Sequence, residues 1–137
     1  MIQLLPTIYF PGTCDAAINF YKNCLNAEIQ EIIYLDAAPT DYLDELDQTT
    51  PEKFVSYSEV EIFGTTFVLT DGGENEMTNQ NFGFTLFIDD DTEIKRIFQL
   101  LAQDGYVTEP LETQFWARLT GNVIDKFGVN WNILTRD

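Results

Sequence analysis

The segment FGTTFVLT, residues 63–70, and the segment FGVNWNILT, residues 127–135, repeat one pattern at an offset of 64 residues. Each starts with Phe-Gly, which is typical of a tight turn, and continues as a strand. Each also ends a longer stretch with hairpin signals, Val55–Gly73 and Ala117–Thr135. We therefore predict two β-hairpins, one in each half of the chain.

An amphipathic helix is predicted before each hairpin. In CDAAINFYKNCL, residues 14–25, apolar residues recur with the spacing of one buried stripe. TEIKRIFQLLAQDG, residues 92–105, repeats this stripe 77 residues later. We expect Asp91 or Thr92 to cap the second helix and Gly105 to end it. The two stripes consist of Ala17, Phe20, Tyr21 and Cys24, and of Ile94, Ile97, Phe98 and Leu101.

A short strand is predicted before each helix, at Leu5–Phe10 and Phe82–Ile88. The order strand-helix-strand-strand-strand therefore occurs twice, which indicates an internal duplication. We predict an α+β fold in which residues 1–137 form a single domain of two βαβββ modules, at about 1–75 and 80–137.

A longer loop, Asp36–Pro51, accounts for the difference between the two offsets. It is acidic and contains a short apolar patch, Tyr42, Leu43 and Leu46. It is interpreted either as a solvated excursion with one helical turn or as a lid over a pocket or an arm onto a partner subunit.

The charge and composition exclude several functions. The chain has 23 Asp and Glu, 7 Lys and Arg, no histidine and a formal net charge of −16. Histidine-ligated metal sites and a histidine general base are therefore excluded within one chain. We expect no nucleic-acid or membrane partner, because both polyanions would be repelled. With no signal-like or membrane-spanning segment in the sequence, we expect a cytoplasmic protein.

Two further features have structural explanations. Cys14 and Cys24 lie at opposite ends of a helix, too far apart for a disulfide, so we expect free thiols. Cys14 is interpreted as a buried residue at a helix start, or as a reactive thiol. The acidic runs at Asp89–Asp91 and from Asp71 to Glu76 lack the spacing of a calcium loop, and we assign them to a helix N-terminus and a solvated turn.

Three segments resemble a known superfamily. They are YFPGTCDAAINFYKNCLNAEI (9–29), YSEVEIFGTTFVLTDG (57–72) and DGYVTEPLETQFWARLTGNVIDKFGVNWNI (104–133). They resemble the vicinal oxygen chelate superfamily, which includes glyoxalase I and bleomycin-resistance proteins. They are most similar to its PhnB-like branch, often labelled demethylubiquinone methyltransferase. The sequence shows no glycine-rich cofactor loop of the dinucleotide kind.

The resemblance implies that the two modules form a curled, mostly antiparallel cup with the helices outside. It also implies a homodimer and a small molecule bound in the cup. Metal-dependent members place four ligands there, at positions that correspond to Pro6, Val68, Gly83 and Asn132. Because these residues cannot together hold a divalent ion, we expect no metal and no cofactor. A motif that often reads His-Ala-Glu-Leu in this branch is Tyr57-Ser58-Glu59-Val60 here.

Strand alternation supplies the candidate pocket residues of the first module. In a two-residue hairpin, Tyr57, Glu59, Val68 and Thr70 share one surface, and Glu61 faces Thr66 on it. We expect this surface to line the cup, with Glu59 either as a proton acceptor or as a rim glutamate paired with Arg118. The opposite surface packs under the helix and consists of Ser58, Val60, Ile62, Phe67 and Leu69.

The second module contributes Trp116, Arg118 and Asn132 to the predicted pocket. Regular alternation would place Arg118 beneath the helices, so we infer a bulge at Gly121-Asn122 that turns it toward the cup. Trp116 is interpreted as a pocket residue or as core or dimer packing. Trp131 is expected to pack under a helix.

Two functions remain open from the sequence. The first is a metal-independent small-molecule binding protein, with bleomycin-resistance-like drug binding as one form, and the acidic charge favours a cationic ligand. The second is a cofactor-free isomerase or epimerase with Glu59 as catalytic base and Tyr57 or Arg118 steadying the developing charge.

Overall fold

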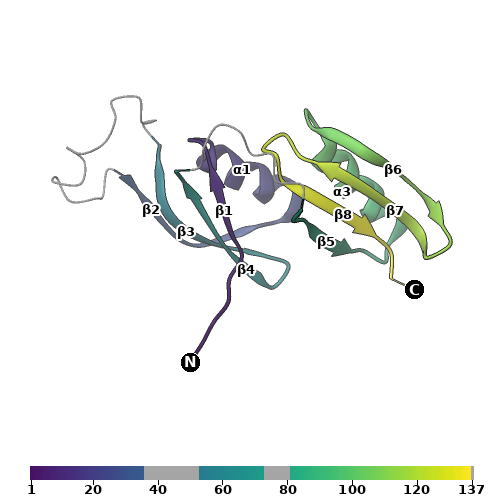
Figure 1. The fold of residues 1–137 in the computed structure, drawn as a ribbon, viewed down its shortest axis with the longest axis horizontal. Coiled ribbons are helices and arrows are strands. Elements are labelled where there is room, and N and C mark those ends of the chain that lie inside the picture. Colours follow the sequence, from purple (N-terminus) through teal and green to yellow (C-terminus); the bar gives the residue numbers. More distant parts are fainter. Residues whose placement is uncertain (36–52, 73–80, 137) are drawn as a thin grey trace. The chain divides into compact units, whose positions relative to one another are not determined.

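The computed structural model describes residues 1–35, 53–72 and 81–136 (Figure 1). These residues fall into two compact units, Met1–Glu76 and Met77–Asp137. The first unit contains β1 (Thr7–Phe10), α1 (Cys14–Leu25), β2 (Glu28–Tyr34), β3 (Val55–Ile62) and β4 (Thr65–Asp71). The second contains β5 (Phe84–Phe87), α3 (Asp91–Ala102), β6 (Tyr106–Gln114), β7 (Ala117–Ile124) and β8 (Asn130–Leu134). The loop at 36–51, with its proposed lid, lies outside the described residues.

Each unit has one open, four-stranded mixed sheet. The strand orders are β1-β4-β3-β2 and β5-β8-β7-β6. The β1–β4 and β5–β8 pairs are parallel, and the other neighbours are antiparallel. The described part of the chain therefore repeats βαβββ, and the predicted α+β class is confirmed. Among the described residues, no helix has the length and apolar character needed to cross a membrane.

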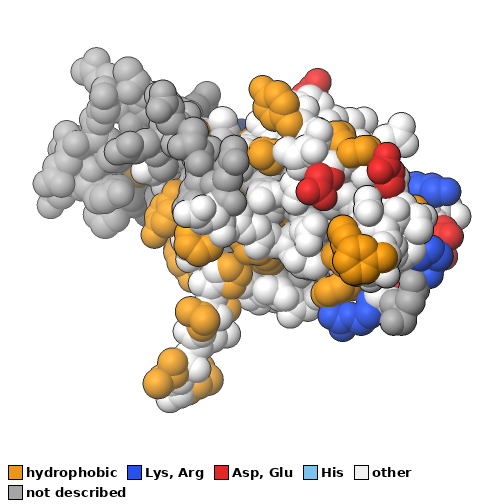
Figure 2. All heavy atoms as spheres, turned by 45° about the vertical axis from the view of Figure 1, so that its right-hand side comes forward, with side chains coloured by type: hydrophobic (Ala, Val, Ile, Leu, Met, Phe, Trp, Pro, Cys, Tyr) orange, Lys and Arg blue, Asp and Glu red, His pale blue; other side chains and the backbone are white. Residues whose placement is uncertain are grey.

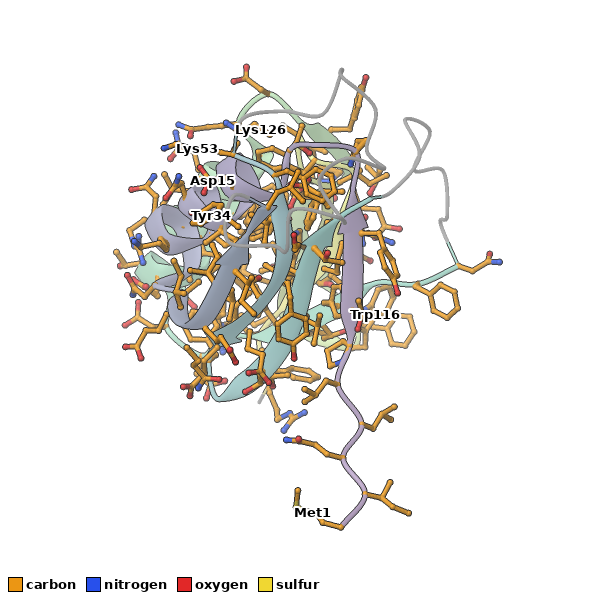
Figure 3. The ribbon with its side chains drawn as sticks, turned by 90° about the vertical axis from the view of Figure 1, so that its left-hand side faces the viewer. Met1, Asp15, Tyr34, Lys53, Trp116 and Lys126 are labelled. Carbon is orange, nitrogen blue, oxygen red and sulfur yellow. The ribbon has the colours of Figure 1, made fainter. Side chains whose placement is uncertain are left out.

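One face of each sheet is covered by the helix of its own unit. Helix α1 packs on β3 and β4, and α3 packs on β6, β7 and β8. The predicted stripes are buried, apart from Phe98, which is half-buried. The strand residues predicted to lie under α1 are also buried, as is Trp131 in the second unit. The hydroxyl of Tyr34, at the end of β2, donates a hydrogen bond to Asp15 of α1 at 2.6 Å (Figure 3).

The two hairpins close differently. Phe63 and Gly64 both have positive φ, 49° and 84°, which is the geometry of the predicted two-residue turn. The connection between β7 and β8 is longer and is organised by Asp125, which is buried. Its carboxylate accepts hydrogen bonds from the N–H groups of Phe127 at 2.8 Å and Val129 at 3.1 Å, and from Nε1 of Trp131 at 2.9 Å.

The ends of α3 differ from the prediction. Asp90, rather than Asp91 or Thr92, is the N-cap, and its carboxylate accepts from the N–H of Glu93 at 2.9 Å. The helix ends at Ala102, and Asp104 takes the positive φ that was expected of Gly105. Gly105 is needed for another reason, since a Cβ there would lie 2.4 Å from the carbonyl oxygen of Ile124.

The start of α1 is capped from a distant strand. Thr13 makes no side-chain cap, and instead Asp71 at the end of β4 accepts from the N–H of Cys14 at 2.9 Å. The other carboxylate oxygen accepts from the N–H of Val55, the first residue of β3, at 2.9 Å. Asp71 is only 5% exposed, so its assignment to a solvated turn was wrong. This carboxylate joins β4, α1 and β3.

The bulge predicted at Gly121-Asn122 was also wrong. β7 pairs with β8 in continuous register there, with Gly121 opposite Ile133 and Asn122 opposite Asn132. The irregularities near these residues lie in β6, whereas β7 gains a residue relative to β6 between Ala117 and Thr120. Asn122 shares the face of Asn132, away from α3, so the alternation that links it to Arg118 required no correction.

Replacing Asp71 with alanine should strongly destabilise the protein. The change leaves two buried N–H groups without an acceptor, and we expect the free energy of unfolding to fall by about 3 kcal/mol. Denaturant titration measures this loss. Glu109→Ala, an exposed change on β6, is the control and should alter it by less than about 0.5 kcal/mol. Equal effects of the two substitutions would contradict the role of Asp71.

Both cysteines are free and buried, which favours the structural interpretation of Cys14. Burial raises the pKa of the Cys14 thiol, and the charges of Asp71 and Asp15 raise it further. We therefore expect a disulfide reagent at mildly alkaline pH to modify neither thiol in the native protein and both after unfolding. Rapid modification of Cys14 in the native state would show instead that it is reactive.

Candidate functional site

The candidate site lies on the open face of the first sheet, defined here as the face away from α1. Strand pairing places Thr7, Val68, Glu59 and Glu31 in one row across all four strands. The next row contains Tyr9 opposite Thr70, and Ile33 opposite Tyr57. Aromatic, apolar and acidic side chains therefore share this surface, a mixture that suits recognition of a small molecule.

The register predicted for the first hairpin is confirmed where the pairing is defined. Glu59 is opposite Val68, and Glu61 is opposite Thr66. The predicted residues Tyr57, Glu59, Val68 and Thr70 are all half-buried. Their role in a ligand pocket remains a prediction.

Glu31 is a part of this site that the sequence did not reveal. It lies on β2 directly opposite Glu59. Two like charges facing each other across antiparallel strands are unfavourable. No lysine or arginine pairs with either carboxylate in the part of the chain that the structure describes. The pair therefore presents negative charge that a bound cation would neutralise.

Tyr57 adjoins this pair. Its pKa is raised above the usual value, first by loss of solvent, then by the charge of Glu59 and a hydrogen bond with it, and also by the charge of Glu31. The phenol therefore stays protonated over a wider range of pH, and the Glu59 carboxylate is held beside an aromatic ring.

Neighbouring polar groups of the open face already have partners in the protein. Gln30 donates to Glu61 at 3.0 Å and accepts from Thr66 at 3.3 Å. The hydroxyl of Thr70 donates to backbone carbonyls, among them that of Ser56 at 3.0 Å. The acidic groups that a ligand can engage most readily are therefore Glu31 and Glu59.

The positions that correspond to metal ligands in the superfamily do not fit a metal here. Thr7, one residue after Pro6, is the β1 residue opposite Val68, and Thr85, two residues after Gly83, is opposite Asn132. Neither the residues first assigned nor these register partners include a charged or histidine ligand. Among the described residues, no group of three or more His, Cys, Asp or Glu side chains could hold a metal ion.

The second unit places its predicted residues differently. Asn132 is opposite Asn122 and Thr85 on the face away from α3. Trp116 lies in the turn between β6 and β7, 56% exposed, with its ring edge-on to Phe115 at 4.7 Å (Figure 3). It is therefore not a core residue of this unit.

Arg118 has a structural partner. Its guanidinium donates to Oδ1 of Asp91 at 2.8 Å and to the carbonyl oxygen of Asp89 at 2.9 Å. These groups lie at the start of α3, so Arg118 holds β7 against the N-terminal end of that helix. It is not paired with Glu59, which was one interpretation of the sequence.

Comparisons with known proteins identify the family. A family model described as 3-demethylubiquinone-9 3-methyltransferase matches residues 2–134. Protein YjdN of Escherichia coli (strain K12) is 31% identical over 139 residues, which cover 96% of this chain and 94% of that protein.

Solved structures share the fold. A putative 3-demethylubiquinone-9 3-methyltransferase, the PhnB protein from Bacillus cereus, has a TM-score of 0.81 at 23% identity, covering 98% of this chain and 100% of that chain. The fosfomycin resistance protein FosX from Listeria monocytogenes has a TM-score of 0.65 at 13% identity, covering 100% and 96%. The chain therefore belongs to the PhnB-like 3-demethylubiquinone-9 3-methyltransferase family and has a glyoxalase-like fold.

Proposed function

We propose that this protein binds a small, positively charged molecule on the open face of its first sheet, without a metal ion. The observation that carries the proposal is the Glu31–Glu59 pair, in which two carboxylates face each other with no lysine or arginine partner among the described residues. An ammonium group between them would relieve their mutual repulsion.

The surroundings of the pair suit an amine with an apolar body. Tyr57 lies beside Glu59, and Tyr9, Val68 and Ile33 occupy the same face. Aromatic rings attract cations through their faces, and apolar side chains can cover the rest of the ligand. A cationic drug, as for the bleomycin-resistance proteins that the sequence resembles, is one ligand of this class.

Metal-dependent chemistry does not fit this site. The positions where the superfamily places its ligands offer threonine hydroxyls, one amide and an aliphatic side chain. These groups cannot replace the carboxylates and imidazoles that hold divalent ions. The proposed binding therefore depends on protein groups alone.

A second candidate is proton transfer without a cofactor. The protonated phenol of Tyr57 next to the Glu59 carboxylate favours it, because Glu59 can accept a proton while Tyr57 donates a hydrogen bond to a developing oxyanion. Deuterium incorporation next to the carbonyl of ketone substrates in D₂O, abolished in Glu59→Gln, would support this function over simple binding.

The proposal includes a cytoplasmic homodimer. The two free, buried thiols are consistent with a reducing compartment. Dimers are common in the superfamily that the sequence resembles, which supports a dimer here.

Removing the charge of Glu59 should weaken binding of a cation. We expect phenethylammonium to shift the amide NMR signals of β3 and β4, and Glu59→Gln to weaken its binding by about fivefold, the effect of losing one partly exposed charge. Raised salt should weaken binding to the wild type in the same direction. The measurement is an NMR titration with each variant.

Two controls make this titration specific. Glu61→Gln alters a carboxylate on the same strand and face, already bonded to Gln30, and should change affinity by less than about twofold. Phenylpropionate, of similar shape but opposite charge, should not bind. Equal losses in Glu59→Gln and Glu61→Gln would mean that only the general negative field matters.

Metal content provides a separate test. We expect untagged protein, incubated with Mn²⁺, Ni²⁺ or Zn²⁺ and then dialysed, to retain far less than one ion per chain by elemental analysis. Stoichiometric retention would contradict metal-independent binding.

A further inference from the structure

Residues 1–5 form an extended arm that leads away from the first unit before β1 begins (Figures 1 and 3). The side chains of Met1, Ile2 and Leu4 are fully exposed, and Figure 2 shows them as a row of apolar groups along the arm. Isolated apolar residues are common on protein surfaces, but a continuous row usually marks a contact.

The arm continues into the edge of the first sheet. The carbonyl oxygen of Pro6 accepts from the N–H of Val68 at 2.9 Å, which fixes the base of the arm on β4. β1 is the edge strand of this sheet, with β4 as its neighbour on one side. The other side of an edge strand presents backbone N–H and C=O groups that can pair with an added strand.

The charge distribution indicates what can cover the arm. The first charged side chain in the sequence is Asp15, so the arm and all of β1 are free of charged side chains. Two copies of a chain with a net charge of −16 repel each other over most of their surfaces. A contact between copies is least unfavourable where both sides lack charged side chains, as they do here.

We propose that the arm of one copy lies along β1 of a second copy, and that the exchange is reciprocal. Residues 1–5 can span about 17 Å, enough to run beside the four residues of β1. Tyr9 is exposed on β1 and offers apolar surface to the incoming side chains. A twofold axis makes both contacts identical.

The buried area is sufficient for a stable dimer. If Met1, Ile2 and Leu4 each bury roughly 100 Å² against an equal area of the partner, two arms give a total of roughly 1,200 Å². This is the lower end of the range for specific protein interfaces, about 1,200–2,000 Å². The exchange therefore accounts for the proposed homodimer and assigns its interface.

The first test is the dimer dissociation constant, measured by sedimentation over a range of concentrations. We expect the double variant Ile2→Ser, Leu4→Ser to raise it by roughly tenfold or more. Phe63→Asn is the matched control, since it removes another exposed apolar side chain at a positive-φ position that asparagine tolerates, and should leave the constant within about twofold.

The second test locates the arm on its partner. A spin label on Ile2→Cys, the other cysteines being buried, is mixed as unlabelled-nitrogen protein with ¹⁵N-labelled protein, so that broadening reports contacts between copies. We expect broadening at the amides of Thr7–Phe10 in the ¹⁵N-labelled copy.

Each other outcome overturns the proposal in a distinguishable way. A wild-type dimer without broadening, or with a constant unaffected by the arm variant, removes the arm from the interface and leaves the homodimer. A wild-type monomer removes both. Lower unfolding stability of the arm variant under monomeric conditions would place the arm on its own chain. Binding of phenethylammonium is measured separately and does not depend on these results.

Discussion

The first unit depends on one buried carboxylate. Asp71 accepts the N–H of Cys14 with one oxygen and the N–H of Val55 with the other. It therefore satisfies the start of α1 and fixes where β3 enters the sheet, which a helix N-terminus and a strand end would otherwise leave unpaired. The entry point of β3 decides which residues face α1, and so it places Glu59 on the open face opposite Glu31.

The second unit solves the same problem with two residues. Asp90 caps α3 locally, and Thr135, 64 residues after Asp71, accepts the N–H of Leu119 at 3.2 Å. The tasks of one buried acid are thus divided between a local cap and a hydroxyl. The sheets kept the same strand order while the face away from the helix diverged, with Asn132 where the first unit has Val68. The duplication preserved the framework and left the exposed faces to specialise.

The sequence predicted what depends on local periodicity: both helices, both hairpins and the inward-facing residues. It did not reveal contacts between residues far apart in the chain. Asp71 seemed solvated because its partners are 57 and 16 residues away. Glu31 was missed because EIQEIIY has no clear alternation, and its register with β3 contains bulges. The connection before α3 is one residue shorter than that before α1, which displaced Gly83 from the register position of Thr85.

The account rests on a cation site built from protein groups alone. A crystal structure of the protein grown with phenethylammonium and a strong chelator tests this most directly. We predict that the ammonium nitrogen lies between the carboxylates of Glu31 and Glu59, within hydrogen-bond distance of both and with its ring near Tyr57. An amine bound elsewhere, with Glu31 and Glu59 in contact only with solvent, would contradict the account.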